Sequence, residues 1–242
     1  MADFGIVHAY KNALAAQKSG DTKTAERLYG DILKVYPKHP DANHNMGSLL
    51  LGINKTEASI PYFKVALEAN FSSAQFWYSY IDALAKSGRF ENANQLLVQA
   101  RAKGAKGKPF QMLNKSISKL EDNYKFKVKQ CKKLFQDGHF NKVIKISNSL
   151  INSYPGLFEP YIFCASGHQS VGNDCDALDN YKIAIRLNPD YAEAHNSMGT
   201  VLQSQGDFDG AIQSYRQAIK IKPDYAEAFN NMGLALLIMG IL

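Results

Sequence analysis

A pattern of residues recurs along this chain every 34 residues, and this period constrains the fold more than any other feature of the sequence. It is clearest from Asp190 to Pro223. A first group there follows the i, i+3, i+4, i+7 spacing of one helix face: His195, Met198, Gly199 and Leu202. Gly206 ends this helix, a second stripe of Ala211, Tyr215 and Ala218 follows, and Pro223 ends the second helix. Helix pairs that recur at such a period predict a helical solenoid.

These residues resemble the tetratricopeptide repeat. Counted from Ala192 as position 1, the residues at the signature positions 4, 7, 8, 11, 15, 20, 24, 27 and 32 are His195, Met198, Gly199, Leu202, Gly206, Ala211, Tyr215, Ala218 and Pro223. The resemblance implies an all-α fold, a right-handed α-solenoid of antiparallel helix pairs. It also implies a concave groove that binds an extended peptide or a partner helix.

The period predicts two blocks of repeats. The first block, 6–107, contains repeats at 6–39, 40–73 and 74–107, with Asn54 at a glycine place because Asn tolerates the left-handed conformation. The phase breaks at 108–123, where apolar residues at spacings of three and four predict an extra amphipathic helix that continues into the next helix. The second block, 124–242, contains repeats at 124–157, 158–191 and 192–225 and a truncated seventh at 226–242.

The seventh repeat holds only a first helix, and the chain ends GLALLIMGIL. A solenoid needs a polar terminal helix over its last apolar face. We therefore expect the chain to be the amino-terminal part of a longer protein; the alternative is a complete protein with a frayed end. We also predict self-association through the apolar stripe of this helix, formed by Met232, Leu236, Leu237 and Met239.

Composition places the chain among globular proteins, since 45% of its residues are hydrophobic and 21% are charged. The sequence contains no run of about 18 apolar residues, so we expect no membrane span. The amino terminus lacks the basic and apolar regions of a secretory signal. The three cysteines, at packing positions or near a helix start, suit reduced thiols, and we expect a cytoplasmic protein.

Positive charge is concentrated between Arg101 and Lys145, where 13 Lys and Arg stand against three acids. Lys125, Lys129 and Lys132 occupy positions 2, 6 and 9 of the fourth repeat, which face the concave groove in the family that the chain resembles. They form either a solvated face or a groove floor that attracts an acidic peptide. Nucleic acid is not the expected partner, because no nucleic-acid-binding motif occurs.

Positions 2, 5, 6, 9, 12 and 13 of each first helix are expected to line the groove. The predicted groove residues are Tyr10, His44, Asn45, Tyr78, Asp82, Lys125, Lys129, Lys132, Glu159, Glu193, Asn196, Gln203, Asn230 and Asn231. Two acidic pairs, Asp190 with Glu193 and Asp224 with Glu227, have the spacing of a capping box. The glutamates at position 2 are therefore interpreted as helix-capping residues, with a role in ligand binding left open.

The sequence suggests no catalytic chemistry. Cys164 and His168 are four residues apart on one predicted helix, but no second pair of metal ligands stands at a fitting distance. No nucleophile, base and orienting residue combine into a site. We expect no enzyme activity in this chain, no cofactor and no metal.

Two classes of function remain open: a protein-interaction scaffold, and a substrate-selecting arm of an enzyme whose catalytic domain lies beyond Leu242. The second rests on a resemblance of AFNNMG and AHNSMG to the repeats of O-linked N-acetylglucosamine transferases. That family presents an asparagine at position 6, which only Asn45 and Asn231 match here. The Lys and Asn clamp by which chaperone-binding relatives grip a terminal carboxylate is missing from both blocks.

Overall fold

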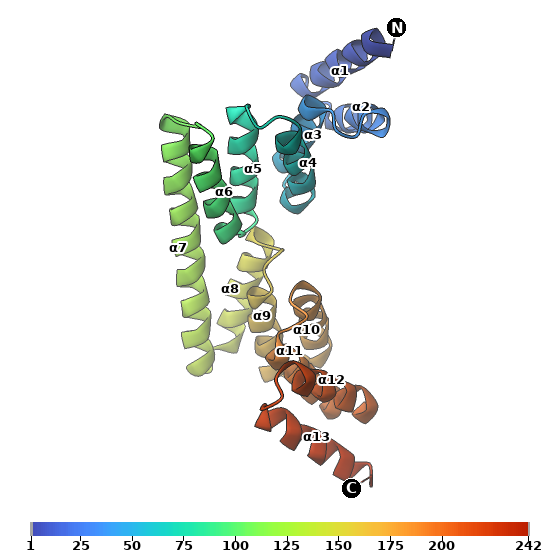
Figure 1. Ribbon diagram of the computed structural model, residues 1–242. Coiled ribbons are helices and arrows are strands. Elements are labelled where there is room, and N and C mark those ends of the chain that lie inside the picture. Colours follow the sequence, from blue (N-terminus) through green and yellow to red (C-terminus); the bar gives the residue numbers. More distant parts are fainter. Residues whose placement is uncertain (1, 242) are drawn as a thin grey trace. The chain divides into compact units, whose positions relative to one another are not determined.

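The structure, a computed structural model, describes residues 2–241. Within this range the regular elements are thirteen α-helices, joined by short turns (Figure 1). Residues up to Asp122 form one compact unit, and residues from Asn123 onward form a second. Leu242, the last residue of the seventh predicted repeat, lies outside the described residues.

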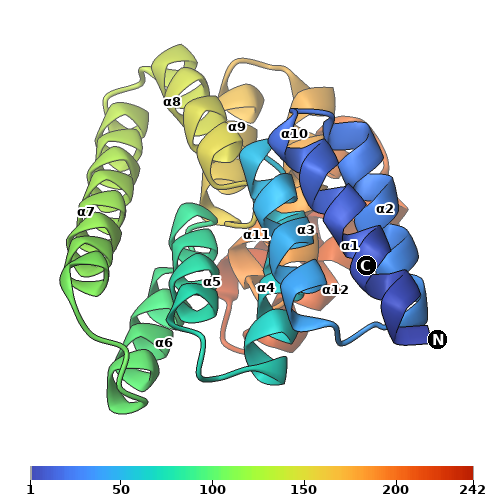
Figure 2. The same ribbon diagram turned by 90° about the horizontal axis from the view of Figure 1, so that it is seen from above.

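The first unit contains six helices and the first part of a seventh. Their bounds are α1 Ala2–Lys18, α2 Thr22–Val35, α3 Pro40–Gly52, α4 Thr56–Ala69, α5 Ala74–Lys86, α6 Phe90–Ala102 and α7 Lys108–Gln136. From α1 to α6, each helix contacts the next one in the chain. Figure 2 shows α1 and α2 side by side, joined by a short turn, as one such pair.

The second unit contains the remainder of α7 and six further helices. These are α8 Phe140–Ser153, α9 Glu159–Ser170, α10 Asp174–Leu187, α11 Ala192–Ser204, α12 Phe208–Ile221 and α13 Ala226–Ile238. From α8 to α13, successive helices are again in contact.

Contacts that skip one helix join odd-numbered helices in both units. In the first unit α3 contacts both α1 and α5, and in the second unit α11 contacts both α9 and α13. Within each unit, these odd-numbered helices therefore form an inner row, while the second helices of the pairs form the outer layer. This arrangement confirms the predicted α-solenoid of helix pairs.

Left-handed residues make the turns within the helix pairs. Gly20, Gly88 and Gly206 have φ values of 81°, 87° and 82°. Asn54 has φ 60° at the equivalent place, which confirms the prediction that it replaces a glycine there. An L-residue with a longer side chain would be strained in this conformation.

The two helices of a pair come closest where the glycine at position 8 contacts the aromatic ring at position 24. Phe63 and Tyr215 are almost fully buried. A Cβ atom added to Gly47 would lie 2.9 Å from the Phe63 ring, and one added to Gly199 would lie 2.6 Å from the Tyr215 ring. These glycines therefore let the two helices of a pair approach closely.

A single helix, α7, covers residues 108–136. Its apolar residues are buried in the first unit at Phe110, Leu113 and Ile117, and in the second unit at Val128 and Cys131. The division of the chain into six full repeats and a truncated seventh remains our proposal. Among the described helices, none combines the length and the apolar character that crossing a membrane requires.

The two predicted capping boxes are wrong. The N-cap residues of α11 and α13 are Tyr191 and Tyr225, and neither makes a side-chain cap hydrogen bond. Each helix begins at an alanine one residue later than the boxes require, so Glu193 and Glu227 stand at the second helical position. Their carboxylates contact neighbouring helices and loops, as described below.

We predict that Gly199→Ala destabilises the fold by about 1–3 kcal/mol, because the new methyl group would overlap the buried Tyr215 ring. Gly233 is the matched control: it occupies the same repeat position, and a Cβ there would meet nothing within 4 Å. Gly233→Ala should leave stability unchanged or raise it by up to about 1 kcal/mol through helix propensity. Urea denaturation of both variants checks this, and equal stabilities would contradict the packing argument.

Candidate functional site

The inner row of first helices carries the predicted groove residues, but these residues differ in exposure. Five of them are exposed: Tyr78, Lys125, Lys129, Lys132 and Asn230. Seven are partly buried: Tyr10, Asn45, Asp82, Glu159, Glu193, Gln203 and Asn231. His44 and Asn196 are buried, with only 7% and 2% of their surface exposed. These two side chains lie within the contacts between repeats.

In the first unit, polar groove residues join neighbouring first helices. Asn45 Nδ2 donates to Tyr10 Oη at 2.7 Å and links α3 to α1. His44 Nε2 lies 2.9 Å from Ser79 Oγ on α5, and the imidazole stacks on the Phe76 ring at 4.9 Å. Burial lowers the pKa of His44, so the ring is neutral at physiological pH. The His44 side chain therefore strengthens the contact between repeats.

The second unit repeats this arrangement. Asn231 Nδ2 donates to Asn196 Oδ1 at 3.0 Å, and Asn196 Nδ2 donates to Glu227 Oε1 at 3.1 Å. Tyr124 Oη donates to Glu159 Oε2 at 2.6 Å. Both asparagines that match position 6, Asn45 and Asn231, therefore donate to the preceding first helix.

The remaining acidic groove residues are also engaged. Glu193 lies 3.7 Å from Lys222 Nζ, and this ammonium group is 4.8 Å from the centre of the Tyr225 ring. Asp82 accepts a hydrogen bond from Lys86 at 2.7 Å. Glu159 and Glu227 thus contribute to contacts between neighbouring repeats, and Glu193 contacts the end of its own repeat. The capping prediction missed these roles.

A hydrogen bond that sequence reasoning missed recurs within three helix pairs. The hydroxyl groups of Tyr29, Tyr181 and Tyr215 at position 24 donate to the side-chain carbonyls of Gln17, Gln169 and Gln203 at position 12, at 2.7, 2.9 and 2.8 Å. The sequence contains a signal for it. The other three full repeats have Phe63, Leu97 and Ser147 at position 24 in place of tyrosine. At position 12 they have Leu51, Ala85 and Phe135 in place of glutamine.

The second half of α7 is strongly basic. Residues 123–136 contain five lysines and no acid. Lys125, Lys129 and Lys132 are exposed, whereas Lys127 Nζ contacts Ser149 Oγ on α8 at 3.5 Å. Like charges four residues apart, as in Lys129 and Lys133, destabilise a helix by about 0.2–0.5 kcal/mol. An anionic partner would relieve this repulsion.

The apolar stripe predicted on the last helix divides into two parts. Met232 and Leu236 pack against the core formed by Ala211, Ile212 and Tyr215. The more exposed apolar residues of α13 are Leu234, Leu237 and Ile238, at 51%, 61% and 54%. The predicted self-association stripe was therefore partly wrong, because two of its members turn toward α12.

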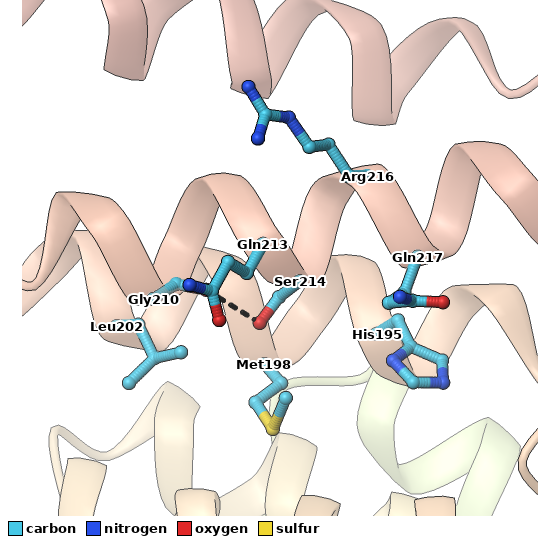
Figure 3. A pocket seen from close by; sticks show the side chains of 8 residues that line it. All are labelled: His195, Met198, Leu202, Gly210, Gln213, Ser214, Arg216 and Gln217. Atoms are coloured by element: carbon cyan, nitrogen blue, oxygen red, sulfur yellow. Dashed lines mark hydrogen bonds between the residues drawn. The ribbon is translucent and has the colours of Figure 1, made fainter.

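A hollow of about 480 Å³ lies against α11 and α12 in the second unit. Its lining residues are His195, Met198, Leu202, Gly210, Gln213, Ser214, Arg216 and Gln217. Figure 3 shows Arg216 pointing away from Met198 and Leu202. The lining includes no carboxylate or thiol to pair with His195 as acid and base. The hollow therefore provides a concave surface with hydrogen-bonding groups but no catalytic pair.

The buried cysteine on α9 is poorly suited to nucleophilic or metal chemistry. Burial, with a smaller effect from Asp176, raises the pKa of Cys164 to about 11, so the thiol stays protonated at neutral pH. His168 Nδ1 lies 3.5 Å from Asp176 Oδ2. Among the described residues, no group of three His, Cys, Asp or Glu side chains is arranged to hold a metal ion.

Comparison with known families agrees with this architecture. A profile described as "Tetratricopeptide repeat" matches residues 10–70 and 44–107, and one described as "TPR repeat" matches residues 172–206 and 199–240. Together these matches cover more than half of the sequence. The chain belongs to the tetratricopeptide repeat family. No curated protein sequence matches it.

Solved structures resemble this chain at low sequence identity. The TPR domain of P58(IPK) is 14% identical with a TM-score of 0.57; the match covers 98% of this chain and 66% of that one. The first TPR of Spaghetti (RPAP3), bound to an HSP90 peptide, is 17% identical with a TM-score of 0.46, covering 48% and 91%. YrrB, "a TPR protein with an unusual peptide-binding site", is 15% identical with a TM-score of 0.39, covering 84% and 96%.

We predict that Asn196→Ala destabilises the second unit by about 1–3 kcal/mol, because it leaves the partly buried amide of Asn231 on α13 without its acceptor. Asn230→Ala is the matched control, since that side chain is exposed on the same inner row. Thermal and urea unfolding of both variants measure the difference. A loss no larger for Asn196→Ala than for the control would refute the structural role of this contact.

The buried tyrosines predict a loss of stability at high pH. Burial raises the pKa of Tyr215 to about 12, whereas an unfolded tyrosine ionises near 10. Between these values the unfolded chain loses a proton that the folded chain keeps, so stability falls with rising pH. Each such tyrosine contributes up to about 1.4 kcal/mol per pH unit. Urea denaturation from pH 9 to 11.5 should show a shallower decline in Tyr215→Phe; parallel declines would contradict this origin.

Proposed function

We propose that this chain is a protein-interaction scaffold whose inner row of helices binds an extended, acidic segment of a partner protein. The observation that carries the proposal is the run of five lysines without an acid on the second half of α7. Lys125, Lys129 and Lys132 are exposed at the repeat positions assigned to the groove. A segment bearing carboxylates would neutralise the repulsion between Lys129 and its neighbours Lys132 and Lys133.

The polarity of the inner row favours a polypeptide over a small apolar ligand. Asn230 is exposed there, and Gln203 and Asn231 are partly exposed, so amide groups that match a peptide backbone are available. A small-molecule site needs an enclosed, mostly apolar cavity. The hollow beside α11 and α12 is open to solvent, and polar side chains such as Gln213 and Gln217 line it together with Met198 and Leu202.

Electrostatic attraction by exposed lysines acts mainly on association rate and specificity, and salt screens it over about 8–10 Å. Binding of an acidic segment should therefore weaken as ionic strength rises. The proposal assigns no reaction to the described residues, because no base, nucleophile and orienting group come together in them.

A random peptide array probed with the whole chain should enrich acidic sequences. Lys129→Glu combined with Lys132→Glu should weaken the selected peptides several-fold, because two favourable charge contacts become repulsive. The control, Lys142→Glu with Lys145→Glu on α8, makes the same change in net charge on a second helix. Equal loss in both double variants would show a non-specific charge effect, and no selected peptide at all would reject the proposed function.

A further inference from the structure

The recurring tyrosine and glutamine pairs do more than satisfy buried hydroxyl groups. Tyr29, Tyr181 and Tyr215 are almost fully buried, so each hydroxyl needs a partner inside the protein. The glutamine carbonyl supplies it, which leaves the amide NH₂ as the free end of the side chain. Because the carbonyl is held, the NH₂ group is oriented before any ligand arrives.

Gln169 shows where this NH₂ group points. Its Nε2 donates to Thr200 Oγ1 at 3.0 Å, and so reaches from α9 to the next first helix, α11. The amide at position 12 is therefore directed along the inner row, at the seam between consecutive first helices. In this pair the donor is already used within the protein.

The equivalent seam between α11 and α13 lacks the acceptor. The residue 34 places beyond Thr200 is Leu234, which has no hydrogen-bonding side chain and is 51% exposed. Within the described part of the chain, Gln203 Nε2 has no hydrogen-bond partner, while Gln203 Oε1 is held by Tyr215 at 2.8 Å. The equivalence with Gln169 and Thr200 points this donor toward the exposed Leu234 side chain.

The surface of α13 around Leu234 extends this combination. Asn230 lies one turn before Leu234 and is exposed, and Ile238 lies one turn after it and is 54% exposed. One face of the helix therefore offers an amide followed by apolar side chains. A polypeptide in extended conformation presents the complementary groups, because its carbonyls and its side chains alternate in direction.

We propose that Gln203 is the hydrogen-bond donor of a peptide subsite at the seam of α11 and α13. It binds a backbone carbonyl of an extended segment and places an apolar side chain of that segment on Leu234 and Ile238. The inference rests on the proposed function and deepens it: the partner segment carries an apolar residue at this seam, in addition to the acidic residues that face α7.

The test uses a fluorescent peptide selected by the wild-type chain from a random peptide array. The variant Gln203→Leu with Tyr215→Phe removes donor and hydroxyl together and reproduces the natural pair of the second repeat, Leu51 and Phe63. No buried polar group is left unpaired, so thermal unfolding should change little. Affinity should fall about fivefold, the effect of one lost neutral hydrogen bond.

A second variant keeps Gln203 but gives its NH₂ group a hydrogen-bond acceptor within the protein. Leu234→Thr creates the acceptor that Thr200 supplies to Gln169, on an exposed position where the fold tolerates a change. It should weaken the same peptide, and the side-chain amide resonances of Gln203 should shift in this variant without peptide. In the wild-type chain the same resonances should shift when the peptide is added.

The matched control is Gln169→Leu with Tyr181→Phe, which removes the pair whose donor Thr200 already occupies. It should leave peptide affinity unchanged. Wild-type affinity in the Gln203→Leu, Tyr215→Phe variant, or an unshifted Gln203 amide on peptide addition, would overturn the subsite while leaving the scaffold proposal intact. Failure of the wild-type chain to select any peptide would overturn both.

Discussion

The close approach of the two helices in a pair is the contact on which the rest of the structure depends. Gly47 and Gly199 lie directly against the rings of Phe63 and Tyr215, and a Cβ atom at either glycine would meet ring atoms at 3 Å or less. Protein interiors are packed at about the density of organic crystals, so there is little room for a larger residue. This spacing sets the distance between the helices of a pair, and with it the surface on which the next pair packs.

Close packing also determines where hydrogen bonds must form. When position 24 is a tyrosine, its hydroxyl group is buried between the two helices together with the ring. A buried hydroxyl without a hydrogen-bond partner lowers stability by about 1–3 kcal/mol. The glutamine at position 12 of the same pair meets this need in three repeats. Where Phe63 or Leu97 occupies position 24, the requirement disappears, and Leu51 or Ala85 occupies position 12. In these repeats, the residue at position 12 therefore follows the residue at position 24 in the core.

Polar residues on the inner row fall into two groups with different roles. His44 and Asn196 are buried and hold consecutive first helices together, with partners 35 residues away in sequence. Lys129, Lys132 and Asn230 are exposed and remain accessible to a partner. In such a row, the contacts that hold the repeats together lie beside the surface that we propose binds a partner.

The sequence by itself determined the class of fold, the helix pairs and the left-handed turns, including the one at Asn54. These features follow from local rules: helical periodicity, the conformational freedom of Gly and Asn, and the helix-ending effect of Pro. Tertiary structure alone decided that His44 and Asn196 are buried, that α11 begins after Tyr191, and that Gln203 is held by Tyr215. The physical reason is distance along the chain. A partner 12 to 35 residues away is set by how helices stack, and the same polar residue at the same repeat position is buried or exposed according to the neighbour it meets.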